Sequence, residues 1–80
     1  MTHILTDGKQ ITIKNDILNE ATVNLADTYN EYMERDLSDE LFNAYSKACK
    51  RFIDVLHISE EDYQSVKLYL KDKCNFSPLN

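Results

Sequence analysis

Carboxylate side chains recur along one side of the segment between residues 16 and 34, at spacings of four, seven, four and three residues. At ~100° per residue of an α-helix, these positions fall within roughly 80° of one another, so a helix presents them as one line. The opposite side of the same helix carries aliphatic and aromatic residues, from Leu18 to Tyr32. We call the line the acidic row; it consists of Asp16, Glu20, Asp27, Glu31 and Glu34.

Carboxylates at these spacings lie side by side on one surface. General acid–base catalysis instead needs groups on either side of a reacting bond, as the two carboxylates of a glycosidase are placed. The sequence also has no Ser-His-Asp pattern, glycine-rich phosphate loop or calcium-loop spacing. We therefore expect a protein that binds a partner and is not an enzyme.

The acidic row has two interpretations. One is an ordinary solvated helix face, since charged residues are common on surfaces and an excess of acids helps solubility. The other is a surface that binds a basic partner, because carboxylates ~5–10 Å apart roughly match phosphate spacing along a nucleic-acid strand. The segment carries almost no Lys, and stacked like charges cost a few tenths of a kcal/mol per pair. In general character the chain is similar to small acidic inhibitors of restriction, CRISPR or repair enzymes, which are often encoded by phages or other mobile elements.

The cysteines and histidines predict neither a disulfide nor a metal site. In antiparallel helices that are joined near residue 58, the positions of Cys49 and Cys74 along the helix axes differ by about 9 Å. A disulfide needs Cα atoms closer than ~7 Å. We expect two free thiols in the core. His3 and His57 stand at no ligand spacing from each other or from the cysteines, so we expect no metal and no cofactor.

The net charge of −5 makes free nucleic acid and anionic membranes poor partners, and favours a protein with a basic surface. No secretory signal and no long apolar run occurs in the sequence, and two cysteines without a signal favour a reducing compartment. We expect a cytoplasmic protein, in the producing or the host cell.

The local patterns predict one domain over residues 1–80, mainly α: a three-helix bundle with a short N-terminal β-hairpin, which is α+β by strict count. Asp7-Gly8 is the only hairpin-type turn signal, so we place the hairpin over residues 2–14. Helices are predicted over residues 16–35, 39–57 and 60–74, capped by Asn15 or Asp16, by Ser38 and by Ser59. Residues 75–80 are predicted to be a non-helical tail, because Pro78 follows Ser77.

The predicted helix over residues 39–57 has the broadest apolar stripe, roughly 160° wide. Such a stripe indicates contact with several neighbours, so we expect this helix to be the central and most buried one. Its apolar positions are Leu41, Phe42, Tyr45, Ala48, Cys49, Phe52, Ile53, Val55 and Leu56.

An apolar surface is the basis of the first alternative. Leu68 lies off the buried row of its helix, and with Phe76 and Leu79 of the tail it can form a partner-binding patch or be covered within the monomer. The hairpin edge can pair with a second copy. Together these features predict a structural or oligomeric adaptor that forms a homodimer.

A transcription or nucleoid regulator is the third interpretation. The segment Leu37-Ser38-Asp39-Glu40-Leu41, with Tyr45-Ser46 and Arg51, is similar to about twenty residues of the small bacterial nucleoid-modulating proteins related to haemolysin expression modulator. A helix-turn-helix would place the start of the last helix in the major groove, where Glu60, Glu61 and Asp62 repel phosphates. We therefore expect no direct contact with nucleic acid.

Overall fold

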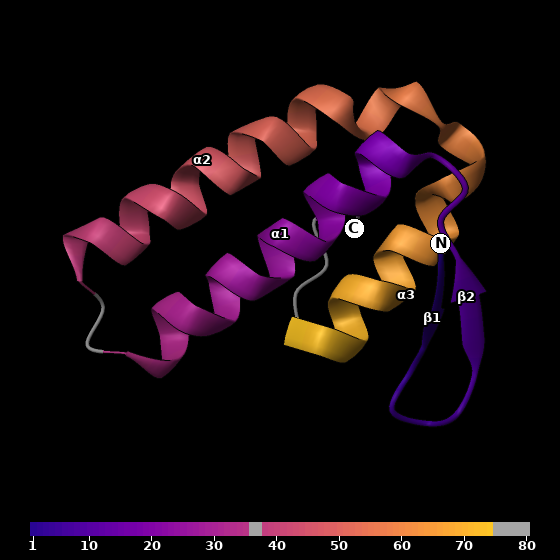
Figure 1. Ribbon diagram of the computed structural model, residues 1–80, viewed down its shortest axis with the longest axis horizontal. Helices are drawn as coiled ribbons and strands as arrows, with labels where there is room; N and C mark the ends of the chain where they lie inside the picture. The colour runs from indigo at the N-terminus through magenta and orange to yellow at the C-terminus, as the bar shows by residue number, and fades with distance from the viewer. Residues whose placement is uncertain (36–37, 75–80) are drawn as a thin grey trace.

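Two short strands form an antiparallel hairpin at the start of the chain. The computed structural model describes residues 1–35 and 38–74 and has β1 at Thr2–Ile4 and β2 at Gln10–Thr12 (Figure 1). His3 pairs with Ile11 in the middle of the ladder. The turn is closed by the Gly8 backbone N–H, which donates to the Leu5 carbonyl oxygen at 2.9 Å. Gly8 has φ +89°, a conformation that glycine adopts without strain, so the turn predicted at Asp7-Gly8 is confirmed.

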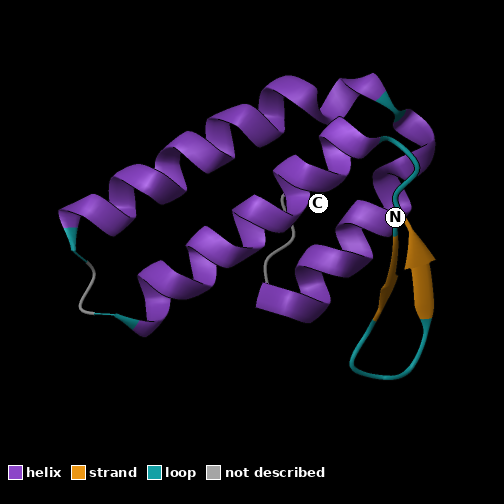
Figure 2. Ribbon diagram, in the orientation of Figure 1, coloured by secondary structure: helices purple, strands orange, loops and turns teal. Residues whose placement is uncertain are grey.

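Within the described residues, three helices follow the hairpin and confirm the mainly α architecture (Figure 2). They are α1 (Asp16–Glu34), α2 (Asp39–Val55) and α3 (Tyr63–Cys74), with two 3₁₀ turns, η1 (Leu56–Ile58) and η2 (Glu60–Asp62), between the last two. Of the two caps considered for α1, Asn15 is the one used, since its side-chain oxygen accepts from the Leu18 N–H at 3.0 Å. The Ser38 hydroxyl caps α2 by accepting from the Leu41 N–H at 3.2 Å.

The boundary between the second and third helices differs from the sequence prediction. We expected helices over residues 39–57 and 60–74 with Ser59 as a cap, but α2 ends at Val55 and α3 begins at Tyr63. The Ser59 side chain makes no capping hydrogen bond. The cause is Asp62, whose buried carboxylate accepts hydrogen bonds from the backbone N–H groups of Lys14 and Asn15. The tight η2 turn places this carboxylate against the segment that joins the hairpin to α1.

The central helix is α1, and the prediction that the second helix would be central and most buried is wrong. In Figure 1, α1 lies between α2 and α3. It buries Leu18, Ala21, Thr22, Leu25 and Ala26, whereas α2 buries only Ala48 and Phe52. The width of an apolar stripe measures how much surface a helix offers, and it does not say which neighbours will cover it. Here α3 packs on α1 and on the hairpin, and part of the α2 stripe stays exposed.

The hairpin is held against α3 by side chains near the carboxyl end of that helix. The Asp72 carboxylate accepts from the Thr6 backbone N–H at 3.1 Å and from its hydroxyl at 3.2 Å. The Lys73 ammonium donates to the Ile4 carbonyl oxygen at 3.3 Å. The His3 and Tyr69 rings meet at 4.7 Å between centroids. These contacts, with the buried Leu5, Ile11 and Ile13, join the hairpin to the core that the helices share.

Candidate functional site

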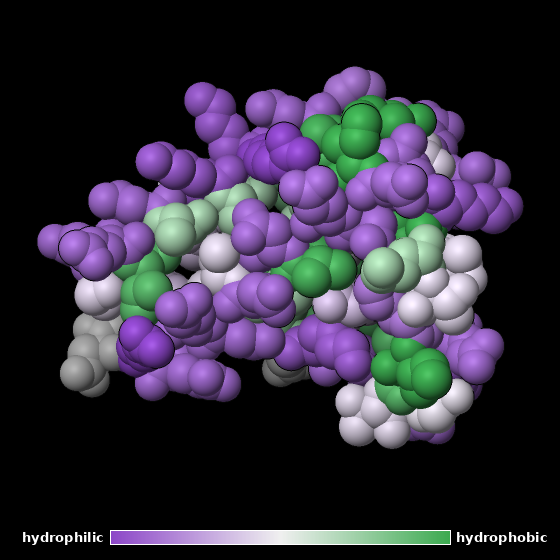
Figure 3. Space-filling view, in the orientation of Figure 1, coloured by the Kyte–Doolittle hydropathy of each residue, from purple (hydrophilic) through white to green (hydrophobic). Residues whose placement is uncertain are grey.

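All five carboxylates of the acidic row are exposed, and they lie on α1 away from its buried face. The flanks of α1 fix this orientation. On one flank Tyr29 packs on Tyr45 of α2, with ring centroids 5.5 Å apart. On the other flank the Asn30 amide donates to the Lys73 carbonyl oxygen of α3 at 3.0 Å. The row therefore faces solvent. Figure 3 shows a mainly hydrophilic surface that is interrupted by separate apolar patches.

Two carboxylates of the row already have a role within the protein. Glu20 and the Arg51 guanidinium of α2 form an ion pair with a 4.0 Å separation, and both side chains are well exposed to solvent. Asp16 stands in the first turn of α1, where the partial positive charge of the helix N-terminus favours an acid. Glu20 and Asp16 therefore belong to the acidic row, but Arg51 and the helix N-terminus balance part of their negative charge.

Asp27, Glu31 and Glu34 have no ion pair with any residue in the described part of the chain. Along the axis of α1 they are separated by about 6 Å and about 4.5 Å, at 1.5 Å per residue. Three unbalanced like charges within two helical turns repel one another, which a cation from outside would relieve. The charge of Asp27 also acts on its surroundings: burial raises the pKa of the Tyr69 hydroxyl, and the Asp27 carboxylate raises it further.

An open depression of about 410 Å³ lies beside the row, where the hairpin meets α1. Its lining combines the carboxylates of Glu20 and Asp27 with two amides and two apolar side chains: Asn19, Asn24, Met1 and Val23. The Asn19 side-chain oxygen is fixed by the His3 imidazole Nε2 at 2.6 Å. The sequence alone does not predict this depression. The one indication is helical spacing, which places Asn19 and Val23 beside Glu20 on the side of α1 that meets the hairpin.

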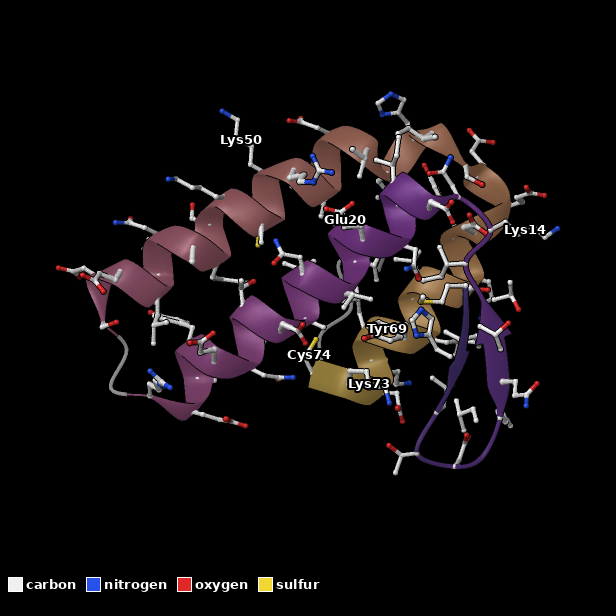
Figure 4. The ribbon with its side chains drawn as sticks, viewed as in Figure 1. Lys14, Glu20, Lys50, Tyr69, Lys73 and Cys74 are labelled. Atoms are coloured by element: carbon white, nitrogen blue, oxygen red, sulfur yellow. The ribbon has the colours of Figure 1, made fainter. Side chains whose placement is uncertain are left out.

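A basic patch borders the acidic row on its other side. Lys47, Lys50 and Arg51 of α2 line a shallow depression of about 340 Å³ together with Asp54 and Val55. In Figure 4 Lys50 points away from α1, whereas Glu20 stands on α1 itself. The surface is thus negative over α1, and it is positive over α2 only around Lys47, Lys50 and Arg51.

Leu68 does not lie with the acidic row. It is half-buried, packs against the core from α3, and borders a separate depression with Leu5, Asp7, Lys71 and Asp72. Its predicted companions in the tail, Phe76 and Leu79, fall outside the described residues. Among residues that are described, its neighbours in this depression are mostly charged.

Cys49 and Cys74 are not joined in a disulfide, as their predicted positions along the helix axes indicate. Cys74 is buried and hydrogen-bonds to the Leu70 carbonyl oxygen at 3.1 Å, and Cys49 is half-buried against the core. Burial raises the pKa of the neighbouring Tyr45 hydroxyl, and a hydrogen bond with the Cys49 side chain raises it further. Residues 1–35 and 38–74 contain no group of three or more His, Cys, Asp or Glu side chains that could hold a metal ion.

The described helices include none with the length and apolar character needed to cross a lipid bilayer. Comparison of the chain with protein-family models, with curated proteins and with solved structures gave no match. The function is therefore inferred from the geometry and the charge of the surface.

Proposed function

We propose that this protein is a small acidic inhibitor or regulator that occupies a basic surface of a partner protein. The observation that carries the proposal is the set of three exposed carboxylates, Asp27, Glu31 and Glu34, which have no ion pair among the described residues and lie in line on one helix. A nucleic-acid-handling enzyme is the partner that fits best, because its basic groove is built for a line of phosphates. In this version the protein mimics nucleic acid and comes from a phage or another mobile element.

The helix supports this role because it holds the charges in a fixed geometry before binding. α1 is packed on both flanks, so its backbone loses little further freedom when a partner binds. The negative field over α1 steers a basic partner toward the row and raises the association rate at low ionic strength. Binding then blocks the groove by occupying it, and no chemical step by this chain is needed. We propose a binding protein, without a cofactor, in the cytoplasm.

Affinity capture from a lysate of the native host tests the proposal. Tagged protein is incubated at low and at moderate salt, and the bound proteins are identified by mass spectrometry. We expect a protein with a nucleic-acid-binding groove that is captured at low salt and released at moderate salt, and whose own nucleic acid competes with this chain. Capture that is indifferent to salt, or the absence of any such protein, would contradict the proposal.

Two matched double variants test whether capture depends on the acidic row itself. Asp27→Asn with Glu31→Gln removes two negative charges from the row, and Asp54→Asn with Glu60→Gln removes two exposed charges elsewhere. The proposal predicts that the first pair abolishes capture and the second pair leaves it intact. Equal loss in both would mean that net charge alone governs binding.

A self-associating adaptor is the second candidate, and a specific observation favours it. Phe42 and Ile53 of α2 are large apolar residues that remain 49% and 66% exposed. The surfaces that we predicted for an adaptor, Leu68 and the hairpin edge, are less suitable, since Leu68 is half-buried and each strand has only three residues.

A further inference from the structure

The apolar stripe of α2 is wider than its contact with α1. Ala48 and Phe52 are buried at its centre, but Ile53 remains 66% exposed. Phe42 remains 49% exposed, although its ring packs on Tyr32 of α1 with 5.6 Å between centroids. At ~100° per residue, Phe42, Ser46, Cys49 and Ile53 fall within about 60° of one another along one side of the helix. We call these four residues the α2 edge. Exposed apolar area of this kind costs about 25 cal/mol per Å², which a second apolar surface would recover.

The α2 edge is complementary to itself when a second copy runs antiparallel to it. Phe42 lies four residues before Ser46, and Ile53 lies four residues after Cys49. A twofold axis midway between Ser46 and Cys49 therefore places Phe42 of one copy opposite Ile53 of the other. The two residues at the centre are small, which permits the close axial separation, about 8 Å, of tightly packed helices.

An acidic side chain at the start of α2 and a basic side chain just after its end are placed to meet in the same antiparallel arrangement. Asp39 lies in the first turn of α2, seven residues before Ser46, and His57 lies in η1, eight residues after Cys49. Both side chains are exposed. The antiparallel arrangement brings the Asp39 carboxylate near the His57 imidazole of the second copy. It also sets the opposite dipole ends of the two helices side by side.

We propose that the α2 edge is the interface of a twofold-symmetric homodimer, in which α2 packs antiparallel against α2 of a second copy. Such an interface is isologous, so each pairing occurs twice. One helix pair buries less than the ~1,200 Å² of a standard interface, so the dimer is weak and depends on concentration.

The dimer leaves the acidic row open. Arg51, which reaches the row through Glu20, stands about 160° around α2 from Ile53. A dimer therefore carries two accessible rows and can bind a partner with repeated basic sites through both. This inference goes beyond the proposed function and does not depend on it, because the two surfaces are separate.

Analytical ultracentrifugation of the untagged chain over a wide concentration range tests the dimer. We expect a monomer–dimer equilibrium that moderate salt changes little. Ile53→Glu should raise the dimer dissociation constant at least tenfold, because it places two charges in the apolar contact. The control, Gln64→Glu, adds the same charge at an exposed position of α3 and should leave the equilibrium unchanged. Circular dichroism confirms that both variants fold.

Cross-linking tests the register. The antiparallel arrangement places Cys49 about 6 Å from Cys49 of the second copy, between Cα atoms. A short bismaleimide should join the two copies in the wild type and fail to do so in Cys49→Ser. A protein that stays monomeric at all concentrations would overturn the proposal, as would a dimer that survives Ile53→Glu or cross-links equally well without Cys49.

Discussion

The Asp62 carboxylate accepts a hydrogen bond from the Lys14 backbone N–H at 2.9 Å, although Asp62 is only 1% exposed and lies 48 residues further along the chain. Its second oxygen accepts from the Asn15 N–H at 3.0 Å. One buried carboxylate thus ties the start of α3 to the junction between the hairpin and α1. The orientation of the acidic row depends on this junction, because Asn15 is also the N-cap of α1.

Removal of the Asp62 carboxylate should strongly destabilise the protein. Asp62→Ala leaves two partly buried backbone N–H groups without this acceptor, and hydrogen bonds to charged groups are worth about 1.5–3 kcal/mol each. We expect the free energy of unfolding to fall by about 3 kcal/mol, measured by urea denaturation. Asp54→Ala, at an exposed position of α2, should change it by less than about 0.5 kcal/mol. Equal effects of the two substitutions would show that the Asp62 contacts contribute little.

Stability should also fall in acid through Asp62. Burial alone would raise the pKa of its carboxyl group, but the N–H groups of Lys14 and Asn15 and the side chain of Ser59 outweigh it and lower the pKa. The charged form is therefore favoured in the folded state. Its contribution is fully present above the unfolded pKa of about 3.9 and is lost as the pH falls through the lower folded value.

The pH prediction is measured as a difference between two proteins, because other acids titrate in the same range. Urea denaturation of the wild type and of Asp62→Asn should give a stability gap at neutral pH that narrows below about pH 4. A gap that stays constant down to about pH 2 would contradict the lowered pKa.

The ion pair between Glu20 and Arg51 should contribute little to folding. Both groups are largely exposed and 4.0 Å apart, and exposed pairs of this kind typically give about 0.2–1 kcal/mol. A double-mutant cycle with Glu20→Gln and Arg51→Gln should therefore yield a coupling energy of about 0.5 kcal/mol or less. A coupling above about 1.5 kcal/mol would mean that Glu20 is a structural residue and not a free member of the row.

The hairpin turn should be sensitive to the residue at position 8. Gly8 has φ +89°, and a Cβ atom there would meet no other atom within 4 Å. The cost of Gly8→Ala is thus conformational, about 1–2 kcal/mol, and Gly8→Asn should cost less because Asn tolerates positive φ better. Urea denaturation of the two variants checks this order. The reverse order would indicate that the turn changes shape on substitution.

The parts of the fold that depend on neighbours in sequence were predictable. Gly8, Asn15 and Ser38 act within three or four residues of themselves, so the turn and two helix starts follow from residue type and spacing. The exposure of the acidic row follows in the same way, since it is the polar face opposite Leu18 and Leu25.

The parts that depend on distant contacts were not predictable from one sequence. The sequence indicates only that Asp62 is an acid in the first turn of a helix. In the structure, its carboxylate accepts hydrogen bonds from the backbone N–H groups of Lys14 and Asn15. The apolar stripe of α2 gives no sign that α3 packs on α1 and leaves Phe42 and Ile53 exposed. The Arg51 partner of Glu20 and the depression beside Asn19 also arise only when separate elements meet.

If the Asp27–Glu34 half of the acidic row binds a basic surface, as we propose, the affinity for the partner must depend on salt through these carboxylates. The dissociation constant for the captured partner is measured across a salt series for the wild type and for Asp27→Asn with Glu31→Gln. Each charge contact with the partner should steepen the fall of affinity with salt. We predict that the double variant binds at least tenfold more weakly at low salt and with a shallower salt dependence. Equal affinities and equal slopes for the two proteins would show that the acidic row does not bind the partner and is a solvated helix face.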